Sequence, residues 1–385
     1  MTTVLVSGAL ANKPLNGGEA WVRLSWLRGL RALGVNVCFV EQIASSACTD
    51  IDGNPAPFEH SINRDYFETV TAAFAPDCPS ALVCEETAVT AGCGFDEMVE
   101  RAGDADLLVN ISGHLTMQPI RSGPRRSAYI DVDPGFTQIW AASGTSGARL
   151  DGHDRYFTVG GNVGSPNCSI PRAGIDWRPL PPPVTLEDWP VLPAPDRIRF
   201  TTVATWRSPL GCVAQNGVAF PGKHHQWRRV LALPRLSRQR FEIALDIHEG
   251  DAADREALVG QGWTLANPRS VAGDPDLFRS YVQGSSAEFS VAHGVYVETS
   301  SGWVSDRTVR YLASGRPALV QDTGVTQQYA GEGLVTFREV HGAAAAADRI
   351  AREYDSHAAA ARALAQASFD AQHVLAGFLD EMGVV

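Results

Sequence analysis

Long apolar runs and excess positive charge are both missing from this sequence. No stretch approaches the roughly 20 apolar residues of a membrane-spanning helix, and no charged and apolar leader precedes the apolar Val4–Val6. The 43 Asp and Glu residues outnumber the 32 Lys and Arg residues, which leaves a formal net charge of −11. General binders of nucleic acids or anionic membranes need a basic face. We therefore expect a soluble, cytoplasmic protein with no membrane segment and no nucleic-acid partner.

Cysteine patterns that indicate a metal site are also missing. The seven cysteines form no Cys-x-x-Cys pair and no cysteine–histidine spacing suited to zinc. We expect buried, reduced thiols and no metal site or other cofactor.

The length of the chain and one proline-rich stretch predict two domains. A chain of 385 residues, 44% of them hydrophobic, can bury more core than one domain usually holds. The stretch 178–183 reads Arg-Pro-Leu-Pro-Pro-Pro, which is too proline-rich for a helix or a strand. We expect a first domain over residues 1–183, a second over 184–368 and a final helix over 369–385.

The first half opens with a strand–loop–helix–strand pattern. Thr3–Ser7 and Val35–Val40 are the expected strands, and both halves alternate strands with helices, as α/β proteins with doubly wound parallel sheets do. Gly17 and Gly18 precede the first helix, where the absence of a Cβ lets backbone amides approach a phosphate. A plain turn is the alternative. We interpret the polar stretch 41–63 as a long loop that could line a substrate pocket.

Two later strands of the first half deliver polar side chains to their carboxyl ends. Residues 105–111 are followed by Ser-Gly-His114, and a histidine there is expected to titrate near neutrality and to bond a ligand hydroxyl or a phosphate. Residues 127–133 end at Asp133, a candidate general base or hydroxyl ligand. The alternatives are a structural histidine and an aspartate that stabilises the Pro134-Gly135 turn.

The second half places basic side chains after a strand and before a helix. Arg207 follows the expected strand Phe200–Thr205 and offers planar donors to a diphosphate. Lys223 opens a later helix, where a cation is unfavourable unless an anion lies beside it. The alternative for Lys223 is an exposed charge without a function.

A strand–helix unit over residues 300–324 completes the pattern. Ser305 is a good helix N-cap, and Asp306 and Arg307 follow it in the first turn. Gly315 and Pro317 end the helix, and a short buried strand then leads into Asp322-Thr323-Gly324. Helix N-termini and carboxyl ends of strands bind phosphates and polar ligands in open α/β sheets.

The segment Tyr-Leu-Ala-Ser-Gly-Arg-Pro-Ala-Leu-Val-Gln-Asp-Thr-Gly, residues 311–324, resembles the donor-site unit of GT-B-fold glycosyltransferases. The opening loop and helix are similar to the first domain of family-4-type enzymes, and family-1-type bacterial enzymes are also similar. The resemblance implies two Rossmann-like domains that face each other across a cleft, with the last helix crossing back to the first domain. It also implies that the second domain binds a nucleoside-diphosphate sugar without a metal. The donor residues that it implies, together with the glycine pair, are Gly17, Gly18, Arg207, Lys223, Ser305, Asp306, Arg307, Asp322, Thr323 and Gly324.

The resemblance fails at one informative place. Family-4-type enzymes carry two glutamates eight positions apart, and alignment on Gly315-Arg316-Pro317 puts Gly302 and Arg310 at those positions. Asp306 lies one helical turn before Arg310 and could substitute for the ribose contact. Retention or inversion of the sugar therefore stays open.

We expect a glycosyltransferase that moves a sugar from a nucleoside diphosphate to a small acceptor, with a natural product as one candidate acceptor and a homodimer as one candidate assembly. Asp133 is the first candidate catalytic residue and His114 the second. A sugar-nucleotide epimerase of the same fold and a non-catalytic sugar-nucleotide binder are the alternatives.

Overall fold

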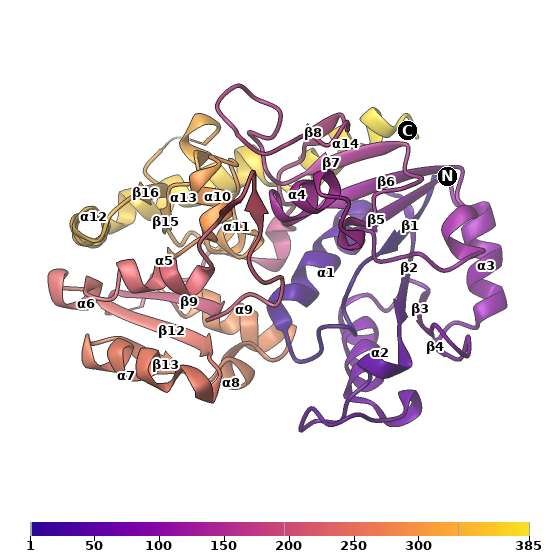
Figure 1. Cartoon of the computed structure of the whole chain (residues 1–385), viewed down its shortest axis with the longest axis horizontal. Helices are drawn as coiled ribbons and strands as arrows, with labels where there is room; N and C mark the ends of the chain where they lie inside the picture. The colour runs from indigo at the N-terminus through magenta and orange to yellow at the C-terminus, as the bar shows by residue number, and fades with distance from the viewer. Residues whose placement is uncertain (1, 196, 330, 385) are drawn as a thin grey trace.

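A computed structural model of the chain describes residues 2–195, 197–329 and 331–384. Two mostly parallel sheets, one from each half of the chain, lie side by side (Figure 1). This arrangement confirms the expected α/β fold with two Rossmann-like domains. No helix in the described part of the chain is long and apolar enough to cross a membrane.

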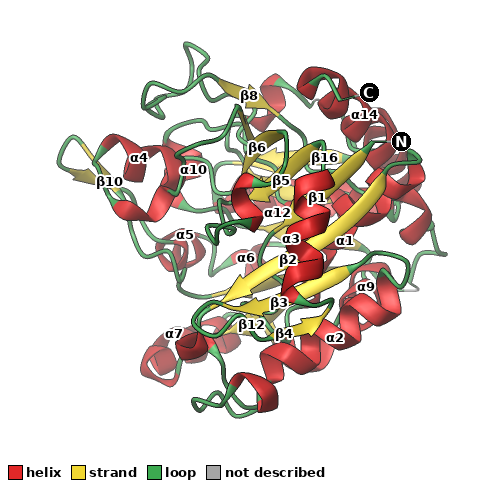
Figure 2. Cartoon of the chain, turned by 90° about the vertical axis from the view of Figure 1, so that its right-hand side faces the viewer, coloured by secondary structure: helices red, strands yellow, loops and turns green. Residues whose placement is uncertain are grey.

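The first sheet has the strand order β4-β3-β2-β1-β5-β6-β7-β8, and all its neighbours pair in parallel except β3 and β4. Helices cover both faces. Leu5 faces the α3 side, and Val4 and Val6 face α1 and α2, as the two-residue period of a strand requires. Figure 2 shows α3 in front of the strands of this sheet. The strands are β1 (Thr3–Ser7), β2 (Asn36–Ile43), β3 (Ser80–Cys84), β4 (Thr90–Gly92), β5 (Leu107–Ile111), β6 (Arg126–Asp131), β7 (Arg155–Thr158) and β8 (Trp177–Pro179). The helices are α1 (Gly17–Ala32), α2 (Ile62–Phe74), α3 (Phe95–Asp104) and α4 (Phe136–Ala142).

The second sheet is parallel and has the order β13-β12-β9-β14-β15-β16. Its strands are β9 (Arg199–Thr205), β12 (Arg240–Asp246), β13 (Thr264–Ala266), β14 (Ala287–Ser290), β15 (Ala318–Gln321) and β16 (Leu334–Phe337). A short hairpin of β10 (Ala214–Gln215) and β11 (Val218–Ala219) follows β9. The helices are α5 (Lys223–Arg229), α6 (Leu233–Leu236), α7 (Ala252–Gly260), α8 (Pro268–Ala272), α9 (Pro275–Gln283), α10 (Gly294–Glu298), α11 (Asp306–Ala313), α12 (Val340–Arg352), α13 (Tyr354–Ser368) and α14 (Ala371–Met382).

Local signals account for the helices that border the cleft. The Asn16 side chain accepts the Glu19 amide and caps α1, while Ser305 accepts the Arg307 amide and caps α11. Gly315, with φ of +67°, ends the turn after α11 in a conformation that favours glycine. The predicted caps of α11 are therefore confirmed.

The last helix lies on the first domain. Trp26 of α1 meets Phe378 of α14 edge-on with ring centroids 5.2 Å apart, and Gly29 leaves room for Leu375. Thr2 donates a hydrogen bond to the Val384 carbonyl, so the two ends of the chain lie together (Figure 1). The C-terminal helix thereby ties the second half of the chain back to the first.

Some elements differ from the expectations. The stretch 41–63 is not all loop, because β2 continues to Ile43 and α2 begins at Ile62. The strands β3 and β16 and the helix α4 were not predicted, because each is short and carries little periodicity. The predicted strand over 127–133 ends at Asp131, which leaves Asp133 in the loop before α4.

The chain order reverses at one point in each sheet. In the first sheet, β1 lies between β2 and β5, and in the second, β9 lies between β12 and β14. Ligands of doubly wound sheets bind outside the carboxyl ends of the strands at such a switch point. The loops after β1, β5, β6, β9 and β12 are therefore the first places to look for a site.

Candidate functional site

Two cavities occupy the cleft between the domains. The first, which we call the β9 cavity, has a volume of about 850 Å³ and lies at the carboxyl ends of β9, β12 and β13. The second, the β6 cavity, has a volume of about 860 Å³ and lies at the carboxyl ends of β5 and β6. Glu19, Thr205 and Asp306 line both cavities, so the two spaces meet at these residues.

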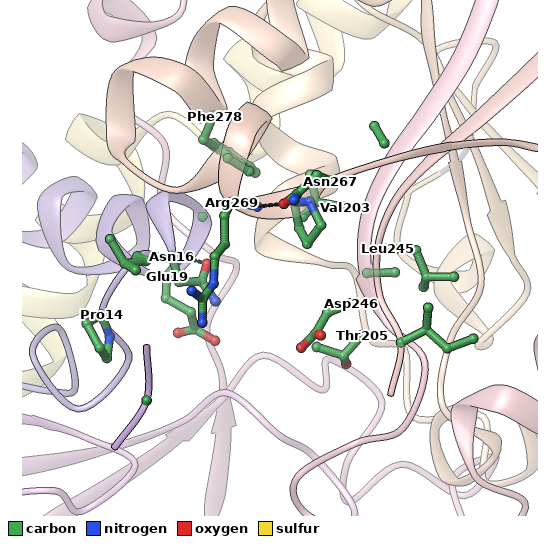
Figure 3. Close-up of a pocket in the computed structure, with 18 of the residues that line it drawn as sticks. Pro14, Asn16, Glu19, Val203, Thr205, Leu245, Asp246, Asn267, Arg269 and Phe278 are labelled. Atoms are coloured by element: carbon green, nitrogen blue, oxygen red, sulfur yellow. Dashed lines mark hydrogen bonds between the residues drawn. The ribbon is translucent and has the colours of Figure 1, made fainter. Parts of the chain in front are cut away.

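The β9 cavity is polar and bounded by both domains. Figure 3 shows Asn16 and Glu19 of the first domain on one side and Thr205 and Asp246 of the second on the other. The Asn267 side chain accepts the Arg269 amide and caps α8 at the cavity wall. This size and mixture of groups suit a nucleotide better than a purely apolar ligand.

Arg307 is a lining residue of the β9 cavity whose charge is already compensated. Its side chain is only 14% exposed and donates to Glu288 at 2.7 Å, to the Val203 carbonyl at 2.8 Å and to the Ser290 hydroxyl at 2.8 Å. Glu288 is fully buried in β14. These bonds fix the start of α11 to β9 and β14.

Lys223, by contrast, has no hydrogen bond or ion pair to another described side chain. It lines the β9 cavity at the first residue of α5. Burial, together with the nearby Arg307 cation, lowers the pKa of Lys223 to about 7. An anion in the cavity would favour the protonated form of this lysine.

Each domain contributes a cluster of paired charges where the cavities meet. Glu19 accepts hydrogen bonds from Lys13 at 2.8 Å and from Arg23 at 2.5 Å, and Asp306 accepts one from Arg310 at 2.8 Å. Burial alone would raise the pKa of Glu19, but the two cations outweigh it and lower that pKa far below its usual range. The Glu19 carboxylate therefore stays ionised and keeps Lys13 and Arg23 in place.

Asp133 lies in the wall of the β6 cavity in a different setting from Asp131. Burial raises the pKa of Asp133 to about 6, against the opposing effect of Lys13. Its Oδ1 accepts one hydrogen bond, from the Tyr296 hydroxyl at 3.1 Å. Asp131 is fully buried and accepts side-chain bonds from Thr137, Gln138 and Thr158, each at 2.7 Å. Asp131 therefore organises the loop, and Asp133 is the carboxylate that faces open space.

His114 also lines the β6 cavity, but it does not titrate near neutrality as expected. Burial and the cations of Arg23, Lys13 and Arg149 lower the pKa of His114 to about 3. An imidazole with so low a pKa is a weak base and stays neutral. The structure therefore corrects the expectation for this residue, which can accept or donate a hydrogen bond but holds a proton poorly.

The glycine pair lies at the start of α1, but the close approach at Gly17 is to protein. A Cβ at Gly17 would come within 2.0 Å of the Asp274 carbonyl oxygen and 2.9 Å of the Phe278 Cβ. Gly18 lines the β9 cavity. Gly17 therefore serves the contact between α1 and α9 of the second domain.

Arg207 lies outside the linings of both cavities. It pairs with Asp251 at 2.5 Å, and its side chain is 54% exposed. It is therefore not grouped with Lys223, Asp306 and Arg307 at the cleft, and Ser305, which is in neither lining, acts as the cap of α11.

Asp322, Thr323 and Gly324 also lie outside these linings. Asp322 pairs with Arg338 at 2.9 Å, and Gly324 takes part in a contact between the domains. The side-chain Nδ2 of Asn162, in the first domain, donates to the backbone carbonyls of Ser300 and Gly324 at 3.0 and 3.1 Å. Thr323 donates to the Trp303 carbonyl at 2.7 Å. The loop thus braces the segment that leads into α11.

Sequence reasoning did not single out Lys13, Glu19, Tyr296 or Trp303. One signal was available for Lys13, because Lys13 and Lys223 are the two lysines of the sequence and both line the cleft cavities. Tyr296 and Trp303 carry no local signal, since each looks like an ordinary core aromatic. In residues 2–195, 197–329 and 331–384, no three His, Cys, Asp or Glu side chains gather closely enough to hold a metal ion.

Comparisons with known proteins support the assignment of the fold. No protein-family model and no curated protein sequence matches the chain. Solved structures do match over nearly the full length. Sucrose-phosphate synthase from Thermosynechococcus elongatus has a TM-score of 0.58 at 13% identity, with 99% of each chain covered. Anabaena HepE in complex with UDP-glucose has a TM-score of 0.59 at 10% identity, with 100% of each chain covered. AviGT4, a glycosyltransferase involved in avilamycin A biosynthesis, has a TM-score of 0.56 at 13% identity, covering 99% of this chain and 97% of that one. The chain has the GT-B fold of these proteins.

Proposed function

We propose that the protein is a glycosyltransferase that moves a sugar from a nucleoside diphosphate to a small hydroxyl-bearing acceptor. The observation that carries the proposal is the meeting of two cavities at Glu19, Thr205 and Asp306, each of a size for one substrate. HepE, a structural neighbour, is described with UDP-glucose bound. A uridine nucleotide is therefore the first donor to test.

The donor nucleotide would occupy the β9 cavity. Lys223 would bind the diphosphate as a cation and stabilise the charge that develops when it leaves. Asp306 at the start of α11 faces both cavities, which suits a carboxylate that bonds a ribose or sugar hydroxyl. Arg307 would act indirectly, because its donors already hold the α11 terminus in place.

The acceptor would occupy the β6 cavity, whose wall combines apolar and polar side chains. Trp26, Trp140 and Trp303 contribute aromatic surface, and His114 and Asp133 are among the polar groups. AviGT4, which has the same fold, is involved in avilamycin A biosynthesis. A natural-product alcohol or phenol is therefore a suitable acceptor class.

Asp133 would act as the general base. A pKa of about 6 leaves the carboxylate ionised at neutral pH while keeping it basic enough to take a proton from an acceptor hydroxyl. The acceptor oxygen would then bond to the anomeric carbon as the bond to the diphosphate breaks. Such a base is what an inverting transfer requires, and a retaining transfer would use the departing phosphate instead.

The first test is thermal stabilisation by a panel of nucleoside diphosphates and nucleotide sugars, because a ligand of the folded state raises the Tm. We expect one base to stand out, with a smaller shift in Lys223→Gln. No shift with any nucleotide would contradict the donor site.

The second test uses the preferred donor with a panel of alcohols and phenols, and follows release of the nucleoside diphosphate. Transfer products with an inverted anomeric centre, absent with Asp133→Asn, are the expected result. A changed sugar configuration without transfer would favour an epimerase. Donor binding without any turnover would favour a binding protein.

A further inference from the structure

We propose that Tyr296 of the second domain is a positioning residue for Asp133 of the first domain, and that the base is complete only when the two domains are in contact. This inference rests on the proposed role of Asp133 as the base. The Tyr296 hydroxyl donates to Asp133 Oδ1 at 3.1 Å, across 163 residues of sequence. Asp133 Oδ2 accepts no hydrogen bond from any described residue, which leaves this oxygen free to take a proton from the acceptor.

The Tyr296 ring is held rigidly, so its hydroxyl has a fixed direction. The residue is 1% exposed in α10. Trp303 lies tilted against it with ring centroids 4.7 Å apart, and His293 and Phe136 meet it edge-on at 5.3 and 6.0 Å. A donor on so confined a ring selects one orientation of the Asp133 carboxylate.

The loop that carries Asp133 is seated directly on the helix that carries Tyr296. Gly135 has a φ of +95°, and a Cβ there would come within 2.8 Å of Val295 Cγ2 on α10. Phe136, the next residue, packs against Tyr296 and His293. Asp133 thus acquires its hydrogen-bond donor from a surface of the other domain.

Besides burial, the groups with the largest effects on the pKa of Asp133 come from several segments of the chain. Lys13, from the loop after β1, favours the ionised carboxylate, while Asp131 and Glu19 disfavour it, and the Tyr296 hydroxyl favours it. Burial raises the pKa of Tyr296 itself well above its usual value, so the phenol remains a donor wherever Asp133 titrates. Loss of the hydroxyl should therefore make Asp133 harder to ionise.

The test compares Tyr296→Phe with Tyr281→Phe in the full-length protein. Tyr281 is a matched control, because its buried hydroxyl has no hydrogen-bond partner among the described residues. We expect Tyr296→Phe to lower kcat by about tenfold, with the donor KM unchanged. We also expect the acidic limb of its pH profile, near pH 6 in the parent, to move to higher pH. Tyr281→Phe should match the parent in both respects.

A lower kcat without movement of the acidic limb would overturn the inference. If Tyr296→Phe does not fold, 3-fluorotyrosine incorporated at position 296 takes its place. This residue is the more acidic phenol and the stronger donor, so the limb should move to lower pH, and an unmoved limb would again overturn the inference. Full activity in Asp133→Asn would instead refute the proposed base, which separates that failure from this one.

Discussion

Arg307 and Asp133, two charged residues at the cleft-facing edges of the two sheets, differ in how completely their hydrogen bonds are made. At the edge of the second sheet, Arg307 meets Glu288, a serine hydroxyl and a backbone carbonyl, so its donors are well supplied with partners. At the edge of the first sheet, Asp133 has a single side-chain hydrogen bond and a raised pKa. We infer that a buried charge with all its hydrogen bonds made stabilises the fold, whereas one with few hydrogen bonds can bind or react with a substrate.

The largest expected effect is on kcat and concerns Asp133, the carboxylate with one side-chain hydrogen bond. Asp133→Asn should lower kcat by about 10²- to 10⁴-fold, the usual range for loss of a general base. The same change should raise the Tm at pH 8. The folded protein holds the Asp133 proton more tightly than the unfolded chain, so the stability that this group contributes falls as pH rises from 3.8 to about 6 and stays reduced above that. Progress curves and melting curves at pH 4 and pH 8 check both parts.

Asp131→Asn is the control for that prediction. Asp131 accepts three side-chain hydrogen bonds, and an amide nitrogen would face at least one of these donors. The expected result is a lower Tm at pH 8, the reverse of Asp133→Asn. A gain in Tm in both variants would break the distinction between the two aspartates.

The next effect is on the free energy of unfolding and concerns Arg307, whose hydrogen bonds hold the start of α11. Arg307→Met leaves Glu288 buried without its cation and should lower the free energy of unfolding by about 3–5 kcal/mol. The double variant Arg307→Met with Glu288→Gln removes both charges and should recover part of that loss. Urea titrations measure both, and equal losses in the single and double variants would show that the ion pair is not the cause.

An intermediate effect concerns nucleotide affinity. The affinity for the nucleoside diphosphate should fall as pH rises above about 7, because Lys223 must then take up a proton to bind it as a cation. Lys223→Gln should weaken binding by about tenfold at pH 6 and flatten this dependence. Calorimetric titrations at pH 6, 7 and 8.5 supply the measurement, and an unchanged slope in the variant would remove Lys223 from the donor site.

The smallest effect sharpens the difference between Lys223 and Arg207. Arg207 is half exposed and pairs with Asp251 outside both cavity linings, so Arg207→Ala should change nucleotide affinity by less than about threefold. The same titrations decide this. A loss as large as that of Lys223→Gln would show that Arg207 turns toward the diphosphate when the donor binds.

Much of the fold follows from short-range patterns. The apolar spacing of Trp21, Leu24, Leu27 and Leu30 predicts α1, and Ser305 and Gly315 mark the two ends of the α11 segment. These features depend on neighbours within a few residues, which is why they can be predicted. The candidate site was predictable only in part. Asp133 lies at the cleft, as a strand-end residue should, but the low pKa of His114 depends on cations from other segments.

The sequence by itself determined two doubly wound halves, their caps and the strand ends at which polar side chains emerge, because each of these depends on local periodicity and turn chemistry. The tertiary structure alone decided which of those side chains meet. Tyr296 reaches Asp133 across 163 residues, and Arg310 reaches Ser25 across 285. Burial and neighbouring groups from distant parts of the sequence set the pKa of the Asp133 carboxylate and that of the Lys223 amine. The hydrogen bond to Asp133 therefore forms only once the two domains have docked, because its donor Tyr296 belongs to the other domain.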